Sequence, residues 1–219
     1  MTLTVRGLSY ERNNKLLLNQ LTFEATSGEA LHILGPNGVG KTSLLQILTG
    51  LVLPLEGQIL WKGIPAAISP SFKKSLLYIS HRLGMKGTLT PFENLYLFLL
   101  RRGVGQAAQS FRQIKQCAKE SIVDALLKFD LAPHSKTLTG LLSFGQQRRL
   151  LLAKLLLVKT DCWILDEPFT ALDSKGIHFV SVLIKEQLQR GGIVIFTSHQ
   201  SFSLLTIAMK RLFLNEASV

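Results

Sequence analysis

Short apolar runs separated by polar turns define the predicted strands of this chain. In the first part of the sequence such runs lie at residues 3–6, 21–25, 31–34, 58–61 and 76–79. Two more follow near the end, at residues 162–165 and 193–197, with apolar residues at helical spacing over 174–189 between them. A strand, a helix and a strand in this order predict neighbouring parallel strands.

Helical patterns dominate the middle of the chain. The predicted helices cover residues 41–49, a stretch that begins at 91, residues 111–129 and residues 143–158. Thr90 and Glu93 form a capping box, and Pro91 stands at the first helical position, which together predict where that helix begins.

These elements predict an α/β fold with a mixed or parallel sheet, an N-terminal antiparallel β region and a helical insertion. We expect one domain over residues 1–219. Its core combines residues 1–83 and 159–219, and residues 84–158 form the helical subdomain between these two halves.

Composition and charge add few restrictions. A hydrophobic content of 47% supports a substantial core. No stretch reaches the ~18 uninterrupted apolar residues that a membrane span needs, and the N-terminus lacks the pattern of a signal peptide. Cys117 and Cys162 are far apart and typical of a reduced, cytosolic protein. The net charge of +11 indicates either an anionic partner or a solvated basic face, and charge alone does not decide between nucleic acid and membrane.

The most informative motif follows the apolar run at 31–34 and matches G-x-x-x-x-G-K-[ST]. Its glycines let consecutive backbone N–H groups turn toward a polyphosphate, Lys41 supplies a positive charge, and the Thr42 hydroxyl can bind Mg²⁺. A chance glycine-rich turn is the alternative, which the flanking strand and helix disfavour. The predicted phosphate-binding residues are Gly35, Pro36, Asn37, Gly38, Val39, Gly40, Lys41, Thr42 and Ser43.

Two carboxylates, Asp166 and Glu167, end the apolar run at 162–165. Asp166 is placed to hold Mg²⁺ opposite Thr42, and Glu167 could polarise the attacking water in a hydrolysis. A strand that merely ends in a solvated acidic turn is the alternative. The phosphate-binding motif upstream favours the catalytic interpretation.

The segment Leu142-Ser143-Phe144-Gly145-Gln146 resembles the LSGGQ signature of ATP-binding-cassette (ABC) ATPases, with Phe144 in place of the first glycine. In that family the signature of one subunit covers ATP held by the phosphate loop of the other. Ser143, Gly145 and Gln146 would accordingly form a second anion site at a helix start. The same residues also make an ordinary helix cap, and both roles can hold at once.

The resemblance implies roles for four further residues. Asp173 corresponds to the D-loop at the dimer interface, and His199 to the switch histidine that contacts the γ-phosphate. Tyr10 matches the aromatic residue that stacks on adenine. His81 stands where the family normally has the glutamine of the Q-loop, and it either acts in catalysis or only shapes the loop.

Within this family the chain looks like the ATP-binding subunits of transporters for cytochrome c maturation, which are described as haem exporters. The segments that carry this likeness are residues 81–86, 89–95, 167–173, 191–194 and 198–200. Among them, His81 and Gln200 best distinguish these subunits from other ABC ATPases.

This likeness implies an ATP hydrolase with ATP and Mg²⁺ as cofactors, which works as a homodimer with integral membrane permease subunits. It would be peripheral, on the cytoplasmic face of a bacterial inner membrane, with no nucleic acid as partner. The alternatives are the ATPase of another small exporter or importer, and a soluble ABC ATPase that acts on nucleic acid.

Overall fold

The computed structural model describes residues 1–103, 111–198 and 209–215, and only the backbone of residues 68 and 111–117. The contacts divide the chain into two compact units. The first contains residues 1–81, 160–168 and 181–219, and the second contains residues 82–159 and 169–180. The division into a core and a helical insertion at residues 84–158 stays a prediction. The contacts additionally group residues 169–180 with the helical unit.

The first unit contains an antiparallel sheet with the strand order β2-β1-β4-β5. Its strands are β1 (Thr2–Arg12), β2 (Lys15–Thr26), β4 (Glu56–Trp61) and β5 (Ile64–Pro65). β1 and β2 are longer than the predicted runs and form a hairpin. Asn13 and Asn14, which connect them, adopt positive φ angles of 52° and 58°. Asparagine tolerates this conformation well, which permits a tight two-residue turn.

A parallel sheet with the order β6-β7-β8-β3-β9 forms the other layer of this unit. Its strands are β3 (Ala30–Leu34), β6 (Leu76–Ile79), β7 (Cys162–Leu165), β8 (Ile193–Thr197) and β9 (Met209–Phe213). The predicted α/β fold with an antiparallel N-terminal region is confirmed. Strand β9 was not predicted, because at this sheet edge Lys210 and Arg211 are exposed and interrupt the apolar pattern.

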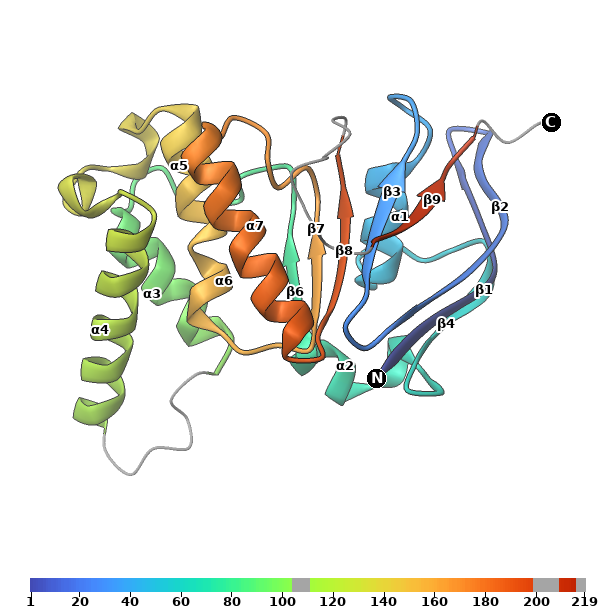
Figure 1. Ribbon diagram of the computed structural model, residues 1–219, viewed down its shortest axis with the longest axis horizontal. Coiled ribbons are helices and arrows are strands. Elements are labelled where there is room, and N and C mark those ends of the chain that lie inside the picture. The colour runs from blue at the N-terminus through green and yellow to red at the C-terminus, as the bar shows by residue number, and fades with distance from the viewer. Residues whose placement is uncertain (104–110, 199–208, 216–219) are drawn as a thin grey trace. The chain divides into compact units, whose positions relative to one another are not determined.

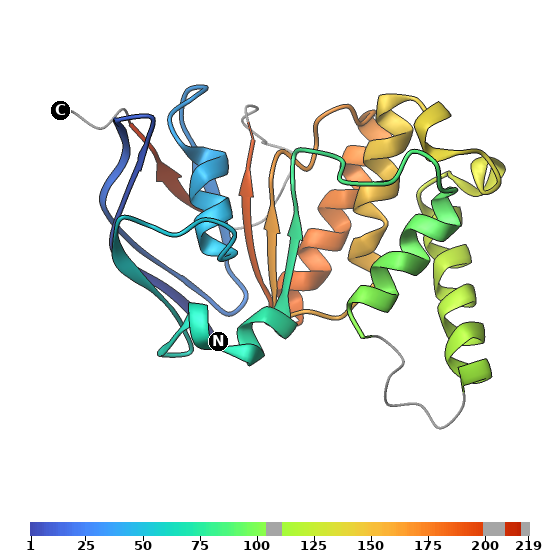
Figure 2. The same ribbon diagram turned by 180° about the vertical axis from the view of Figure 1, so that it is seen from behind.

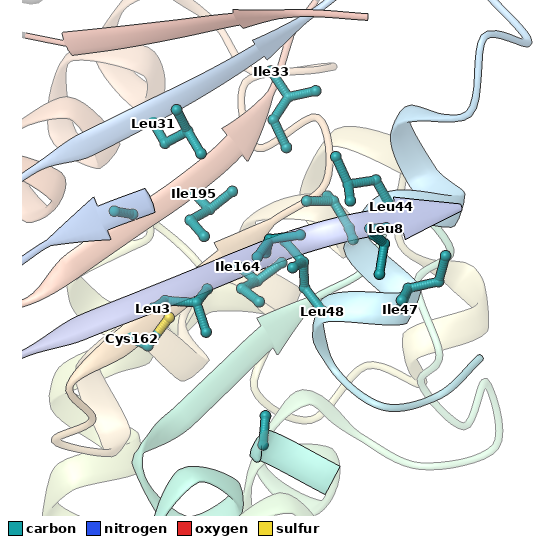
Figure 3. Packing of buried hydrophobic residues seen from close by; sticks show 14 of the residues in the cluster. Leu3, Leu8, Leu31, Ile33, Leu44, Ile47, Leu48, Cys162, Ile164 and Ile195 are labelled. Atoms are coloured by element: carbon teal, nitrogen blue, oxygen red, sulfur yellow. The ribbon is translucent and has the colours of Figure 1, made fainter. Parts of the chain in front are cut away.

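Helix α1 (Lys41–Leu48) lies between the two sheets (Figures 1 and 2). Its Leu44, Ile47 and Leu48 are buried in the same hydrophobic cluster as Leu3 of β1 and Ile164 of β7 (Figure 3). Because the helix has apolar side chains on both sides, both sheets cover it. This burial fixes the position of its first turn beside the end of β3. Two short elements that were not predicted, α2 (Pro70–Ser75) and the 3₁₀ turn η1 (Ala66–Ile68), precede β6.

The second unit is helical. It contains α3 (Pro91–Arg101), α4 (Phe111–Lys128), α5 (Phe144–Leu152), α6 (Lys154–Leu157) and the 3₁₀ turns η2 (Ala132–His134) and η3 (Thr139–Leu141). The capping box at the start of α3 is confirmed, since Thr90 and Glu93 accept from each other's backbone N–H groups.

Two further points concern the helices. The prediction of one continuous helix over 143–158 was wrong, because the helix is interrupted at Ala153. Ala153 is neither glycine nor proline, so the sequence does not indicate this interruption. Helix α7 (Ser174–Gln189) begins in the second unit and ends in the first. Within the described part of the chain, no helix combines the length and the apolar character needed to cross a membrane.

Candidate nucleotide-binding site

The phosphate loop connects β3 to α1 and depends on glycine at two positions. Gly35 has a φ of 149°, and a Cβ atom there would lie 2.5 Å from the carbonyl oxygen of Leu214. Gly40 caps α1 with a left-handed φ of 109° and without a side-chain hydrogen bond. The first N–H groups of α1 are therefore not occupied by a capping side chain, which makes this helix start suited to an anion.

Lys41 is held inside the loop that it follows. Its Nζ donates to the carbonyl oxygens of Gly35 at 2.7 Å and Pro36 at 2.8 Å, and only 8% of the residue is exposed. Burial lowers the pKa of Lys41, while the nearby Glu167 and Asp166 act in the opposite direction. These contacts hold the positive charge of Lys41 at the phosphate loop, where it would attract the phosphates of a nucleotide.

A cavity of about 260 Å³ opens at this loop. Its lining combines residues from the loop, the β1–β2 hairpin and the ends of β6 and β7: Arg12, Leu17, Asn37, Gly38, Gly40, Lys41, Thr42, Ser43, His81, Asp166 and Glu167. The structure thus brings the phosphate loop, both carboxylates and His81 to one cavity. Val39 lies instead in the hydrophobic core, with 5% of its surface exposed.

Tyr10 is not among the residues that line this cavity. It is partly buried and packs against the hydrophobic core, whereas Arg12 and Leu17 reach the cavity from the same hairpin. Neither Arg12 nor Leu17 was expected from the sequence. The stacking of Tyr10 on adenine therefore stays a prediction that the lining of the cavity does not support.

Asp166 is oriented by two threonine hydroxyl groups. Thr42 donates to its Oδ2 at 3.0 Å, and Thr197 donates to its Oδ1 at 2.7 Å. The backbone N–H of the adjacent Glu167 donates to the same Thr197 oxygen at 2.9 Å. Thr197 was missed by the sequence reasoning, although a polar residue at the end of an apolar strand is the same signal that identified Asp166.

Thr42 and Asp166 have the donor types that fit Mg²⁺. Magnesium at nucleotide sites is usually held by one or two carboxylates and a hydroxyl, with substrate phosphates and water as the remaining ligands. The described residues contain no group of three or more His, Cys, Asp or Glu side chains that could hold a metal.

The signature segment lies in the second unit and has the geometry of a helix cap. Ser143 Oγ accepts the N–H of Gln146 at 3.2 Å, and the Gln146 side chain accepts the N–H of Ser143 at 2.9 Å. Gln146 also contacts His134 at 2.8 Å. At Gly145 a Cβ atom would lie 3.0 Å from the carbonyl oxygen of Ala171, so this position favours glycine. Half of Phe144, at the first helical position, is exposed.

Asp173 is tied to the same unit at the start of α7. It accepts from the Gly176 N–H at 2.9 Å and from Arg149 at 2.7 Å. The Gly176 hydrogen bond is the main reason why the pKa of Asp173 is lowered, with Arg149 contributing. Arg149 belongs to α5, so the helix that carries the signature also orients Asp173. The remaining predicted residue, His199, lies outside the described residues.

Comparisons with known proteins agree on one family. The family profile described as "ABC transporter" matches residues 18–170. The chain is 41% identical over 201 residues to a cytochrome c biogenesis ATP-binding export protein, CcmA, of Haemophilus influenzae, which covers 90% of this chain and 89% of that protein.

Solved structures show the same fold. An ABC transporter ATP-binding protein from Pyrococcus furiosus is 28% identical, covers 100% of both chains and superimposes with a TM-score of 0.78. A dimeric ATP-binding cassette bound to ADP and Pi is 21% identical, with a TM-score of 0.80 over 98% of this chain and 94% of that one.

Proposed function

Because this chain belongs to the ABC transporter family and hydrolyses ATP as its members do, we propose that it energises an export complex for c-type cytochrome biogenesis. The observation that carries the proposal is the 41% identity, over 90% of the chain, to a protein whose name states this process. The cavity at the phosphate loop supplies the chemistry that such a protein needs.

Hydrolysis in this cavity would depend on groups with separate tasks. The N–H groups at the start of α1 and the Lys41 ammonium would bind the β- and γ-phosphates of ATP. The Glu167 carboxylate would orient a water molecule and accept its proton as the water attacks the γ-phosphorus, while the bond from this phosphorus to the β–γ bridging oxygen breaks and ADP leaves. His81 lines the cavity, and in this proposal it would donate a hydrogen bond to a phosphate oxygen or to that water.

Mg²⁺ is expected between Thr42 and Asp166. When bound there it would neutralise charge that develops on the phosphate oxygens. The Thr42 hydroxyl would supply one oxygen ligand, and the Asp166 carboxylate would act directly or through water. The carboxylate is already oriented for this task by its hydrogen bonds with Thr42 and Thr197.

The signature and the phosphate loop support a homodimer as the active form. In this arrangement Ser143, Gly145 and Gln146 of one copy would bind the ATP held by the other copy, with Asp173 at the interface. The solved cassette with ADP and Pi is described as dimeric, and it shares the fold of this chain. The capping box of α5 uses the N–H groups of Ser143 and Gln146, and the other N–H groups in the first turn of a helix have no partner within the helix, which suits contact with phosphate.

The partners would be integral membrane permease subunits, with this chain bound peripherally at the cytoplasmic face of a bacterial inner membrane. The H. influenzae relative is named an export protein, which supports a membrane partner. Haem as the exported compound rests on the description of the related transporters and belongs to the same proposal.

Deletion of the gene, with complementation, tests this function. We expect the deletion strain to lose covalent haem staining of its c-type cytochromes and to regain it with the wild-type gene but not with a Glu167→Gln variant. Normal b-type cytochrome spectra serve as the control for haem supply. Normal haem staining in the deletion strain would contradict a role in c-type cytochrome biogenesis.

The charge of +11 is compatible with one competing function, an ABC ATPase that acts on nucleic acid. Binding of the purified protein to RNA and to DNA should be measured at several salt concentrations, beside its co-purification with membrane proteins. Salt-dependent nucleic-acid binding that stimulates ATP hydrolysis, without any membrane partner, would favour this second function.

A further inference from the structure

Thr197 lies on the strand between the one that leads into the phosphate loop and the one that leads to Asp166. It is the last residue of β8, and none of its surface is exposed. In the parallel sheet it pairs with Ile33 of β3, the strand that leads into the phosphate loop. On its other side β8 pairs with β7, the strand that leads to Asp166. Its hydroxyl therefore lies beside the Asp166 carboxylate and the Glu167 backbone, although Thr197 is distant from both in the sequence.

The Thr197 hydroxyl uses its donor and its acceptor at the same time. It donates to Oδ1 of Asp166 at 2.7 Å and accepts the N–H of Glu167 at 2.9 Å. The donated bond is charge-assisted and short, which makes it strong for its type. With Oδ1 held by Thr197 and Oδ2 held by Thr42, rotation of the Asp166 carboxylate is restricted at both oxygens.

The bond to Glu167 has a second consequence. Glu167 has a φ of 52°, which places a residue with a Cβ atom in the left-handed region. This conformation costs energy for any residue other than glycine, and it persists only where surrounding contacts favour it. The hydrogen bond to Thr197 is one such contact. It holds the backbone of Glu167, which lines the cavity.

We propose that Thr197 is a positioning residue that fixes the Asp166 carboxylate for Mg²⁺ and the Glu167 backbone for water activation. The inference rests on the proposed function, in which Asp166 holds the cation and Glu167 is the base. Loss of a group that orients a metal ligand through a hydrogen bond typically lowers metal affinity or activity by about 10–100-fold.

Substitution of Thr197 by residues with and without a hydroxyl tests the proposal. Thr197→Val keeps the shape of the side chain and removes both hydrogen bonds, whereas Thr197→Ser keeps the hydroxyl. Thr139→Val is the matched control, because Thr139 is equally buried, its hydroxyl accepts from Asn94 at 3.0 Å, and it belongs to the other unit. The purified proteins should be compared in thermal unfolding without nucleotide.

Two measurements separate positioning from a general structural role. The first is the affinity for a fluorescent ATP analogue in the presence of EDTA. Because EDTA removes the divalent cation, this affinity reports binding of the nucleotide alone. The second is the concentration of Mn²⁺, followed by its paramagnetic resonance, that half-saturates the ATP-bound protein. For Thr197→Val we expect the cation concentration to rise by about tenfold or more and kcat to fall by a similar factor. Binding in EDTA should stay unchanged, and Thr197→Ser and Thr139→Val should resemble the wild type.

Unchanged Mn²⁺ binding and kcat in Thr197→Val would overturn the proposal. A parallel loss of nucleotide binding in EDTA would also overturn it, since the role would then be structural. If Thr197→Val does not fold, Thr197→Ala against Thr197→Ser provides the same comparison, because these two differ by the hydroxyl alone. A wild-type protein without Mg²⁺-dependent ATPase activity would instead contradict the proposed function, independently of Thr197.

Discussion

The hydroxyl of Thr42 donates a hydrogen bond to Oδ2 of Asp166 at 3.0 Å, although 124 residues separate them. Thr42 lies in the first turn of α1, and Asp166 follows β7. The helix is buried between the two sheets and Asp166 is buried as well, so the core holds the first turn of α1 beside Asp166. The phosphate loop and the carboxylates are thus held in place relative to each other before a nucleotide binds. This lowers the entropic cost of arranging them for hydrolysis.

The first prediction concerns Glu167→Gln. If Glu167 accepts the proton of the attacking water, the variant should bind ATP with normal affinity but hydrolyse it about 10²–10⁴ times more slowly. ATP that is not hydrolysed should hold two copies together, so a dimer should be detected by size-exclusion chromatography. Glu186→Gln removes an exposed carboxylate from α7 and is the control. Near-normal turnover in Glu167→Gln would remove Glu167 from the role of base.

Lys41→Ala should weaken the binding of ATP itself. The variant removes a positive charge that contacts phosphates in the ground state, and a charge-assisted contact contributes about 1.5–3 kcal/mol, or one to two decades in affinity. Equilibrium binding of ATP measures the effect, with Lys185→Ala on the exposed surface of α7 as the control for net charge. Equal dissociation constants for Lys41→Ala and the wild type would contradict the assigned contact.

The phosphate loop and the two carboxylates were predictable because each depends on residues close together in the sequence. The motif at 35–42 has fixed spacing, and Asp166 stands directly after an apolar strand. Thr197 carries a comparable local signal, but its partner depends on the pairing of β7 with β8. Strand pairing is a tertiary property, and the residues of a single strand do not specify it.

Tyr10 shows a second limit. Side chains alternate between the two faces of a strand, so a shift of one residue moves each side chain to the opposite face. The β1–β2 pairing has irregularities between Leu8 and Tyr10 and between Tyr10 and Glu11. These bulges direct Tyr10 toward the core and allow Arg12 to reach the cavity. The amino-acid pattern of the hairpin does not reveal where the bulges occur.

A pH-dependent stability is expected from Lys154. Burial lowers its pKa to about 8, with a contribution from Arg101, and its Nζ lies 5.2 Å from the centre of the Phe98 ring. Between that value and the ordinary lysine pKa of 10.5 the unfolded chain binds more protons than the folded chain. The free energy of unfolding contributed by Lys154 should therefore rise with pH across this window.

Lys154→Met removes this dependence and keeps an apolar contact with the ring. The variant should be more stable than the wild type by roughly 1–3 kcal/mol below pH 8, and the difference should shrink as the pH approaches 10.5. Urea unfolding at pH 7 and 9.5 measures it, with Lys159→Met as an exposed control. A stability difference that does not change with pH would show that Lys154 has the same charge in both states.

The last prediction concerns docking to the membrane partner, which we expect at residues 81–86 and 89–100. In α3, Leu95 and Leu99 are buried and unavailable for contact, whereas Lys86 is exposed and Met85 is half-buried. Met85→Asp with Lys86→Glu replaces an apolar and a basic contact by two negative charges, which should oppose binding beside anionic lipid. We expect membranes that contain the permease to retain much less of the double variant, while its ATPase activity in solution stays near normal. Leu141→Asp, on an exposed leucine of η3, is the control. Co-purification of the double variant with its membrane partner at wild-type levels would place the docking site elsewhere.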